Sequence, residues 1–582
     1  MEKRVLLAVT LSFLVLLVYQ ALVPSPPKRP GSTPAPAAVE SSQAVPESAS
    51  PAATEADAAQ TAPVEAPAAD AVADVAAREI VVRSGPLRAV FSNRGAVITS
   101  WRLNRFFDEK DEPIDLVPAD LPPQAARPFS LRMPDPAHTA QLRGALFRTD
   151  APATIDATNE PATLRFEYQG ANGLQVRKTF RIDPESYVIT YSVEASLNGA
   201  PLNPAIEWGP GLGDATHLEA QSSGSFGTYH QKPQAIVYAD GSVERLRPSD
   251  VAEQPTWSGD FPFAGIDDHY FIATLVRPGP ARLTFQPLTA PLPGQADVQR
   301  EMMGFEVVYQ SEVRDKRVYF GPKEFDVLAS VDRDLVRSIH FGVFSFLAVP
   351  LLRSLKWINA LVGNYGWSII ILTVLINAAM FPLRHKSVVS MRKMQELQPQ
   401  VKAIQDRYSK LKLTDPARGK MNEELMQLYR EKGVNPASGC VPMLLTIPVL
   451  FAFYSMLSVA VEIRGEPWAL WITDLSRHDP LYITPVLMGL TMVWQQRMTP
   501  MADPAQARIM MLTPVIFLFF FLWAPSGLVL YWLVSNLLAI GQQYATNRII
   551  GKPVVRQVRP PAERRLKQAG AGKTEGARGA GR

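Results

Sequence analysis

The stretch YGWSIIILTVLINAAMFPL, residues 365–383, is almost entirely apolar and long enough to cross a lipid bilayer as a helix. It nevertheless carries Asn377 about one helical turn after Thr373. A carboxamide in hydrocarbon is unfavourable unless it is hydrogen-bonded or hydrated. The stretch therefore indicates a membrane protein whose spans carry polar side chains for a reason, and the other spans must be found first.

The chain has 582 residues, too many for one ordinary core, so several domains are expected. Apolar runs predict an N-terminal anchor, uncleaved because no small-x-small cleavage site precedes the prolines, and five further spans. A cleaved signal peptide is the alternative for the first run. The six predicted spans are residues 1–23, 363–383, 440–461, 481–499, 509–524 and 528–547.

The region between the first two spans divides into three parts. Residues 24–77 have no aromatic residue, Leu or Ile, which predicts a disordered Pro/Ala-rich linker. Residues 78–330 alternate apolar and polar residues between Gly, Asn, Asp and Pro breaks, which predicts an antiparallel β-sandwich. Residues 335–362 predict an amphipathic helix in the outer membrane interface. The fold class is therefore a multi-domain membrane protein, a β-sandwich followed by a helical five-span core.

Two basic blocks set the orientation in the membrane. Residues 384–433 hold twelve Lys/Arg against six Asp/Glu, and residues 549–582 hold nine against two. The rest of the chain is acidic, so the positive-inside rule puts both blocks and both termini in the cytoplasm, and the β-sandwich outside. The tail at 549–582 is expected either to bind ribosomal RNA or only to enforce this topology.

The first basic block is predicted to form a cytoplasmic helical hairpin over residues 384–436. The apolar steps from Leu397 through Val401, Ile404 and Tyr408 to Leu411 follow a coiled-coil seam. The hairpin is either a plain solubilised coiled coil or a docking arm for a nascent chain, a targeting factor or a translocon.

Several spans carry polar or amphipathic side chains that we take as candidate site residues. On residue types alone, they indicate either interhelical hydrogen bonds or a shared water-bearing groove. Thirteen of the seventeen methionines lie between Met380 and Met511, which favours a groove that accepts many apolar helices. The short span at 509–524 also favours local thinning of the bilayer. The candidates are Thr373, Asn377, Gln495, Gln496, Trp532, Ser535, Asn536 and Gln542.

The sequence offers no catalytic or metal-binding motif. It has no HExxH, no CxxC and no nucleophile elbow, and its one cysteine is Cys440. Within the β region, His230, Asp267, Asp268 and His269 could belong to a hydrolytic or sugar site, but no catalytic spacing supports this, so structural roles are favoured. We expect no cofactor, no metal and no enzymatic activity.

Three motifs resemble the YidC family of membrane-protein insertases. They are NPASGCVPMLLTIPVLFAFYSML (435–457), FFLWAPSGLVLYWLVSNLLAIGQQ (520–543) and WSIIILTVLINAAMFPL (367–383). NRGAVITSWRL and FGPKEFDVL in the β region resemble the family more weakly. The resemblance implies a Gram-negative inner-membrane protein that takes hydrophobic segments of nascent membrane proteins from ribosomes or the Sec translocon. It implies that a hydrophilic groove, open to the cytoplasm, then releases them into the lipid bilayer.

The resemblance also implies roles for particular residues. The family's substrate-contacting positions fall on Thr373 and Trp532, the latter in place of the usual Tyr. The family's groove arginine aligns with Asn377, which carries no charge, so we expect hydration and thinning to replace simple attraction of an acidic tail, unless Arg384 or Arg497 substitutes for it. Two other functions stay open, a membrane-tethered carbohydrate-binding or carbohydrate-active protein using the β domain, and a small-solute transporter, although no internal repeat supports the transporter.

Overall fold

The computed structural model describes residues 72–108, 111–118, 121, 125–209, 212, 233–292, 295–408, 417–433, 441–498 and 511–550. The predicted anchor, the linker up to Ala71, His230, Cys440 and the tail from Gly551 onward lie outside the described residues.

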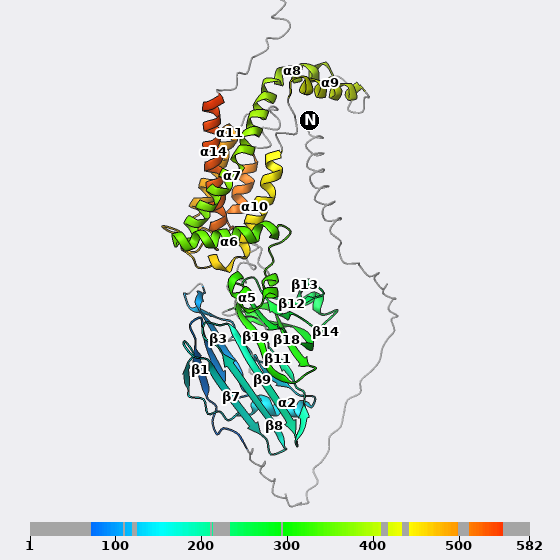
Figure 1. The fold of residues 1–582 in the computed structure, drawn as a ribbon, viewed down its shortest axis with the longest axis vertical. Helices are drawn as coiled ribbons and strands as arrows, with labels where there is room; N and C mark the ends of the chain where they lie inside the picture. The colour runs from blue at the N-terminus through cyan, green and yellow to red at the C-terminus, as the bar shows by residue number, and fades with distance from the viewer. Residues whose placement is uncertain are drawn as a thin grey trace, which may run out of the picture. The chain divides into compact units, whose positions relative to one another are not determined.

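The predicted β region folds into three sheets (Figure 1). The first, in the order β4-β3-β2-β1-β6, joins β1 (Glu79–Arg83), β2 (Leu87–Ser92), β3 (Val97–Phe107), β4 (Pro113–Asp115) and β6 (Thr154–Asp156). The second, in the order β13-β12-β15-β16-β19-β9-β8-β7 with β10 paired to β9, joins β7 (Ala162–Gln169), β8 (Leu174–Ile182), β9 (Val188–Leu197), β10 (Ala200–Leu202), β12 (Gln234–Ala239), β13 (Ser242–Leu246), β15 (Phe263–Asp267), β16 (Phe271–Val276) and β19 (Val313–Pro322). The third, in the order β14-β17-β18-β11-β5, joins β5 (Ser130–Arg132), β11 (Ala205–Glu207), β14 (Thr256–Asp260), β17 (Pro280–Leu292) and β18 (Gln295–Tyr309).

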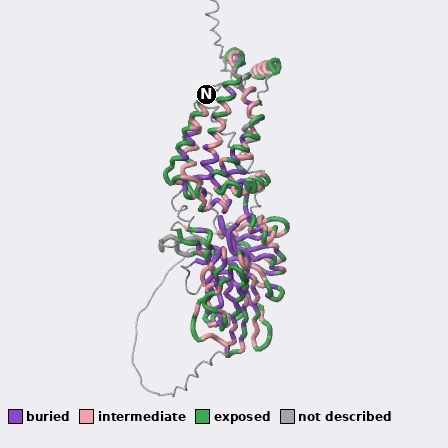
Figure 2. The backbone as a smooth tube through the Cα atoms, turned by 60° about the vertical axis from the view of Figure 1, so that its left-hand side comes forward, coloured by how far each residue is buried: buried purple, intermediate pink, exposed green. Residues whose placement is uncertain are grey.

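Side-chain contacts show that the second sheet packs against the other two, as a sandwich requires. Trp101 of β3 stacks on Phe320 of β19, and its indole N–H donates to the Phe320 carbonyl at 2.9 Å. On the other side, the hydroxyls of Tyr191 on β9 and Tyr309 on β18 are 2.5 Å apart. Figure 2 shows buried residues concentrated along these strands. The alternation in the sequence therefore predicted the β-rich region correctly, although β1 and β6 pair in parallel.

Short helices complete the β region and lead out of it. They are α2 (Pro136–Gly144), α4 (Pro248–Val251), α5 (Phe325–Val331) and the 3-10 helix η1 (Arg333–Ser338). The helical region then contains α6 (Ser345–Val362), α7 (Tyr365–Glu396), α8 (Gln398–Arg407), α9 (Ala417–Glu431), α10 (Val441–Val459), the 3-10 helix η3 (Val461–Ile463), α11 (Ile483–Met498), α13 (Thr513–Phe521) and α14 (Ser526–Ile550). Figure 1 shows α7, α10 and α14 side by side, with α6 crossing them.

By length and hydropathy, two of the described helical stretches could cross a membrane, Ser345–Val362 and Tyr365–Ser390. α10, α11, α13 and α14 lie where the other spans are expected, but the count of five spans and the anchor stay predictions. α6 buries Ala348, Leu352, Leu355 and Ile358 and exposes Phe346, Trp357 and Leu361, which is the two-faced pattern expected of an interfacial helix.

The helical hairpin has a definite contact between its arms. Val401 and Ile404 of α8 are buried, and the Tyr408 hydroxyl after α8 donates to Glu424 of α9 at 2.7 Å. Arg407 pairs with the same carboxylate at 2.9 Å. Residues 409–416, between the two arms, lie outside the described residues.

Gly265 of β15 is expected to tolerate no side chain. A Cβ there would overlap the Ala273 carbonyl oxygen and the Thr274 backbone on β16. Gly265→Ala should lower the free energy of unfolding of the β region by about 2 kcal/mol or more. Thermal unfolding of the purified chain in detergent measures this. Gly144→Ala is the matched control, because a Cβ at the end of α2 meets nothing within 4 Å; equal stability of the two variants would contradict the packing.

Candidate functional site

The start of α7 is fixed by its N-terminal Asn364. The Asn364 side-chain oxygen accepts from the Trp367 N–H at 3.1 Å, which caps the helix. Its amide nitrogen donates to the carbonyls of Pro467 and Trp468, both at 3.1 Å. The loop after α10 therefore holds the end of α7 that lies nearest α6. This fixes the position of the polar residues further along α7.

Asn377 lies between α7 and α14 and is buried, with 9% of its surface exposed. Its amide nitrogen donates to the Thr373 carbonyl at 2.8 Å and, more weakly, to the Ser535 hydroxyl of α14 at 3.4 Å. Thr373 is fully buried, and its hydroxyl donates to the Ile369 carbonyl at 2.6 Å. Thr373 and Asn377 therefore lie together as the sequence suggested, with part of their hydrogen bonding inside the bundle.

The side-chain oxygen of Asn377 accepts a hydrogen bond from Arg384. The Arg384 Nη1 atom is 2.6 Å from Asn377 Oδ1. The two residues are seven positions apart, about two helical turns, so they share one face of α7. Arg384 is half-buried, and no carboxylate lies within 4 Å of it among the described residues. A positive charge therefore lies beside the Asn377 amide.

The candidate residues of α14 contact three different helices. Ser535 meets Asn377 of α7, whereas the Asn536 amide nitrogen donates to the Thr491 hydroxyl of α11 at 3.4 Å. Trp532 packs against Phe517 and Phe521 of α13, with ring centroids 5.4 and 5.2 Å apart. These neighbouring positions of α14 therefore divide their side chains among three helices.

The glutamines lie towards the ends of α11 and α14. Gln495, Gln496 and Gln542 are half-buried. The amide nitrogen of Gln542 is buried and has no hydrogen-bond acceptor in the described part of the protein. The structure does not bring the glutamines into contact with Asn377 or Trp532 through any hydrogen bond between described residues.

Two contacts were missing from the sequence interpretation. Thr491 was not considered, because a single Thr on an apolar helix carries no signal until its partner is known. Tyr531 stacks on Phe453 of α10 with centroids 4.1 Å apart, and this aromatic contact likewise depends on packing. The bond between Asn377 and Arg384, by contrast, is indicated by the sequence, because residues seven positions apart lie on one face of a helix.

The histidine and aspartates of the β region have structural roles. Asp267 pairs with the Lys323 ammonium at 3.1 Å, and both side chains are buried. Asp268 accepts from the Tyr270 and Phe271 backbone N–H groups. His269 Nε2 hydrogen-bonds the Ser458 carbonyl of α10 at 2.7 Å. These residues support the turn and its contact with α10, and among the described residues no metal-binding group of His, Cys, Asp and Glu occurs.

Comparisons with known proteins identify the class of protein as a bacterial inner-membrane insertase. The family model described as the 60Kd inner membrane protein matches residues 357–553, and the YidC periplasmic domain model matches residues 79–354. The membrane protein insertase YidC of Syntrophus aciditrophicus is 35% identical over 94% of this chain and all of that protein. That of Geobacter metallireducens is 36% identical over 94% of this chain and 99% of that protein. The chain belongs to the YidC family of membrane protein insertases.

A solved structure gives the same name at lower similarity. An active YidC insertase with its first transmembrane domain resolved is 19% identical, with a TM-score of 0.34, over 81% of this chain and 95% of that chain. The family assigns the β region to the periplasm and the chain to the inner membrane. The relatives are insertases and not enzymes, and nothing in these matches supports the carbohydrate-active or transporter alternatives.

Proposed function

We propose that the protein inserts hydrophobic segments of nascent membrane proteins by giving their polar tails a hydrated path between α7, α11 and α14. The observation that carries this proposal is the Arg384 guanidinium held by the Asn377 amide. A guanidinium has five N–H groups, and among the described residues only Asn377 accepts from this one. The remaining donors require water, lipid headgroups or a client segment, because an unsolvated charge at membrane depth is strongly unfavourable.

The shortness of α13 supports the same proposal. Its nine residues, Thr513–Phe521, rise only about 14 Å as an α-helix. The hydrocarbon core of a bilayer is about 30 Å thick, so the lipid must thin or the helix ends must be sheltered here. Thinning beside α13 shortens the distance over which a polar tail meets hydrocarbon.

The apolar part of the client would contact the aromatic and methionine side chains beside this path. Trp532 lies against Phe517 and Phe521, and Met492 of α11 is half-buried. Methionine adapts to many apolar surfaces, which suits a protein with many unrelated clients. Thr373, which the resemblance implied to contact substrate, is fully buried, and its hydroxyl is bound to its own helix.

The cytoplasmic parts would bring clients to this path. With both termini in the cytoplasm, the hairpin formed by α8 and α9 and the basic tail lie where a ribosome or the Sec translocon delivers nascent chains. Their surplus of Lys and Arg suits a docking surface for ribosomal RNA, with a strong dependence on salt. The insertase would act alone or together with the translocon.

The charge of Arg384 is expected to matter for clients with polar translocated tails. Arg384→Gln should lower their insertion about tenfold, the loss of one charge-assisted interaction. Asn377→Leu should have a similar effect, because it removes the acceptor that holds Arg384. Insertion into vesicles, scored by protease protection of the tail, measures this. Leu375→Ala on the exposed face of α7 is the control. If both Arg384→Gln and Asn377→Leu insert these clients at the wild-type rate, the polar residues only bond the helices to one another and the hydrated path is wrong.

Hydration of the path can be measured directly by thiol labelling. In a Cys440→Ser background, which has no cysteine, a Ser535→Cys variant should react with a membrane-impermeant maleimide added from the cytoplasmic side. A Leu537→Cys variant should stay protected, because that side chain is on the outer surface of α14, 49% exposed and facing lipid. Equal protection of both thiols would show a dry bundle and refute the hydrated path.

A further inference from the structure

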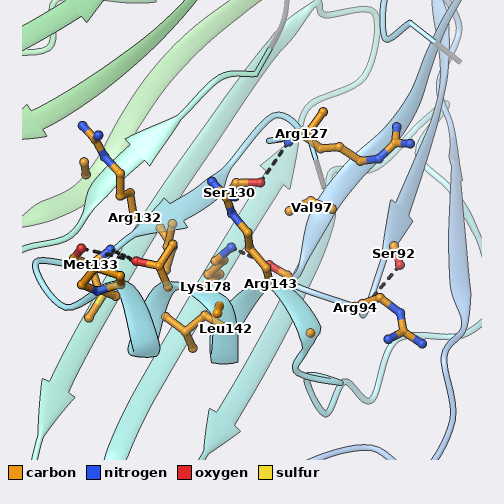
Figure 3. A pocket seen from close by; sticks show the side chains of 18 of the residues that line it. Ser92, Arg94, Val97, Arg127, Ser130, Arg132, Met133, Leu142, Arg143 and Lys178 are labelled. Atoms are coloured by element: carbon orange, nitrogen blue, oxygen red, sulfur yellow. Dashed lines mark hydrogen bonds between the residues drawn. The ribbon is translucent and has the colours of Figure 1, made fainter. Parts of the chain in front are cut away.

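The β domain contains a large cavity that the insertion path does not use. Its volume is about 1140 Å³, and it lies between the β2–β3 turn, the segment 125–134, α2 and β8 (Figure 3). Its apolar wall includes Val97, Leu131 and Leu142. A cavity of this size and mixed lining exceeds what a single small anion needs.

Four arginines line this cavity: Arg94, Arg127, Arg132 and Arg143. Arg143 pairs with Glu207 at 2.8 Å, and Arg132 pairs with Glu306. These carboxylates are register partners on β11 and β18, and burial, as the largest influence, raises the pKa of Glu306.

Arg94 and Arg127 differ from the other two arginines of the cavity. Neither has a carboxylate within 4 Å in the ranges that the structure describes, whereas Arg132 and Arg143 each pair with one. Arg94 is exposed and Arg127 half-buried, and both residues line the cavity. The cavity wall therefore carries positive charge that the described protein does not neutralise.

A buried lysine holds the two turns that carry these arginines. Lys178 has 1% of its surface exposed and occupies an inward position of β8, between the buried Val176 and Phe180. Its ammonium donates to the carbonyls of Gly95, Ala96 and Phe129 at 2.7, 3.1 and 2.8 Å. All three of these residues have positive φ, at 71°, 47° and 72°.

Left-handed backbone at Ala96 and Phe129 is strained, so it persists only where contacts stabilise it. Arg94 and Arg127 stand within two residues of these strained turns. Lys178 thus fixes the turns in place through hydrogen bonds to neutral backbone carbonyls. Among the described residues, no carboxylate contacts its ammonium directly. Burial lowers the pKa of Lys178 to about 7.

We propose that this cavity binds acidic segments of client proteins after they reach the periplasm, with Arg94 and Arg127 as the carboxylate-binding groups. The proposal rests on the insertase function proposed above. Basic residues of membrane proteins stay in the cytoplasm, so translocated loops and tails are depleted in Lys and Arg and present mostly acidic charge. Arginine suits this task because its planar fork binds carboxylates through two hydrogen bonds. The apolar wall and the volume suit a peptide segment.

The test measures peptide binding to the full chain in zwitterionic nanodiscs by fluorescence anisotropy. A glutamate-rich peptide should bind, and its glutamine counterpart should not. The Arg94→Gln/Arg127→Gln double variant should weaken binding about tenfold or more. The matched control, Arg105→Gln/Arg177→Gln, removes the same charge from paired surface arginines and should leave binding within about twofold.

Three results would overturn the proposal. Equal weakening by both double variants would show attraction by net charge alone. Displacement of the peptide by low-millimolar inorganic phosphate would show a small-anion site. Binding to anionic phospholipid vesicles that depends on Arg94 and Arg127, without peptide binding, would show a lipid site.

The insertion assay separates this proposal from the hydrated path. The Arg94→Gln/Arg127→Gln variant should reduce insertion of a client with an acidic tail but not of one with a neutral polar tail, whereas Arg384→Gln should reduce both. If the peptide binds with the expected specificity but Arg384→Gln inserts clients at the wild-type rate, the cavity proposal holds and the hydrated path is wrong. If Arg384→Gln loses insertion but the peptide does not bind specifically, the hydrated path holds and the cavity proposal is wrong.

Discussion

Hydrocarbon provides no hydrogen bonds, and the polar side chains of the helical region are arranged around that constraint. Asn377 satisfies this constraint because both the nitrogen and the oxygen of its side-chain amide form hydrogen bonds. The nitrogen donates to Thr373 and Ser535, which ties α7 to α14, and the oxygen accepts from Arg384. Interhelical bonding and a polar path were alternatives on the sequence, but one side chain can serve both, because a carboxamide is donor and acceptor at once.

Sequence patterns predicted the elements better than the contacts between them. Alternation in residues such as those of β8 indicated strands with one buried face, and apolar runs indicated the positions of α7, α10, α11 and α14. α7 continues to Glu396, so one helix runs from the predicted span at 363–383 into the predicted hairpin at 384–436. α13 is shorter than the span predicted there, beginning only at Thr513.

The candidate site was predictable only within one helix. Asn377 and Arg384 share a face of α7 because seven residues make two turns, so their contact follows from the spacing. The residues Trp532, Ser535 and Asn536 also lie close on one helix, yet they meet α13, α7 and α11 respectively. A helix in a bundle has several neighbours, and side chains separated by one turn or less can face different ones. Contacts between helices therefore cannot be predicted from the spacing of residues along one helix, because they depend on how the helices pack.

The β domain is joined to the helical region by a cluster of ion pairs around one lysine. Lys356 of α6 lies 2.7 Å from Asp326, 3.4 Å from Glu324 and 3.5 Å from Glu462, and the Glu462 carboxylate also accepts from the Phe325 N–H at 3.2 Å. Three carboxylates surround this one ammonium, so the network fixes geometry and leaves no positive charge for a ligand. Arg384 and Lys178 are held differently, by an amide and by backbone carbonyls. A neutral oxygen fixes the position of a cation without cancelling its charge, so Arg384 keeps a positive potential in the helical bundle, whereas Lys178 positions the turns that carry Arg94 and Arg127 in the β domain. Carboxylates at either place would stabilise the fold equally well but would repel the acidic tails that an insertase must move.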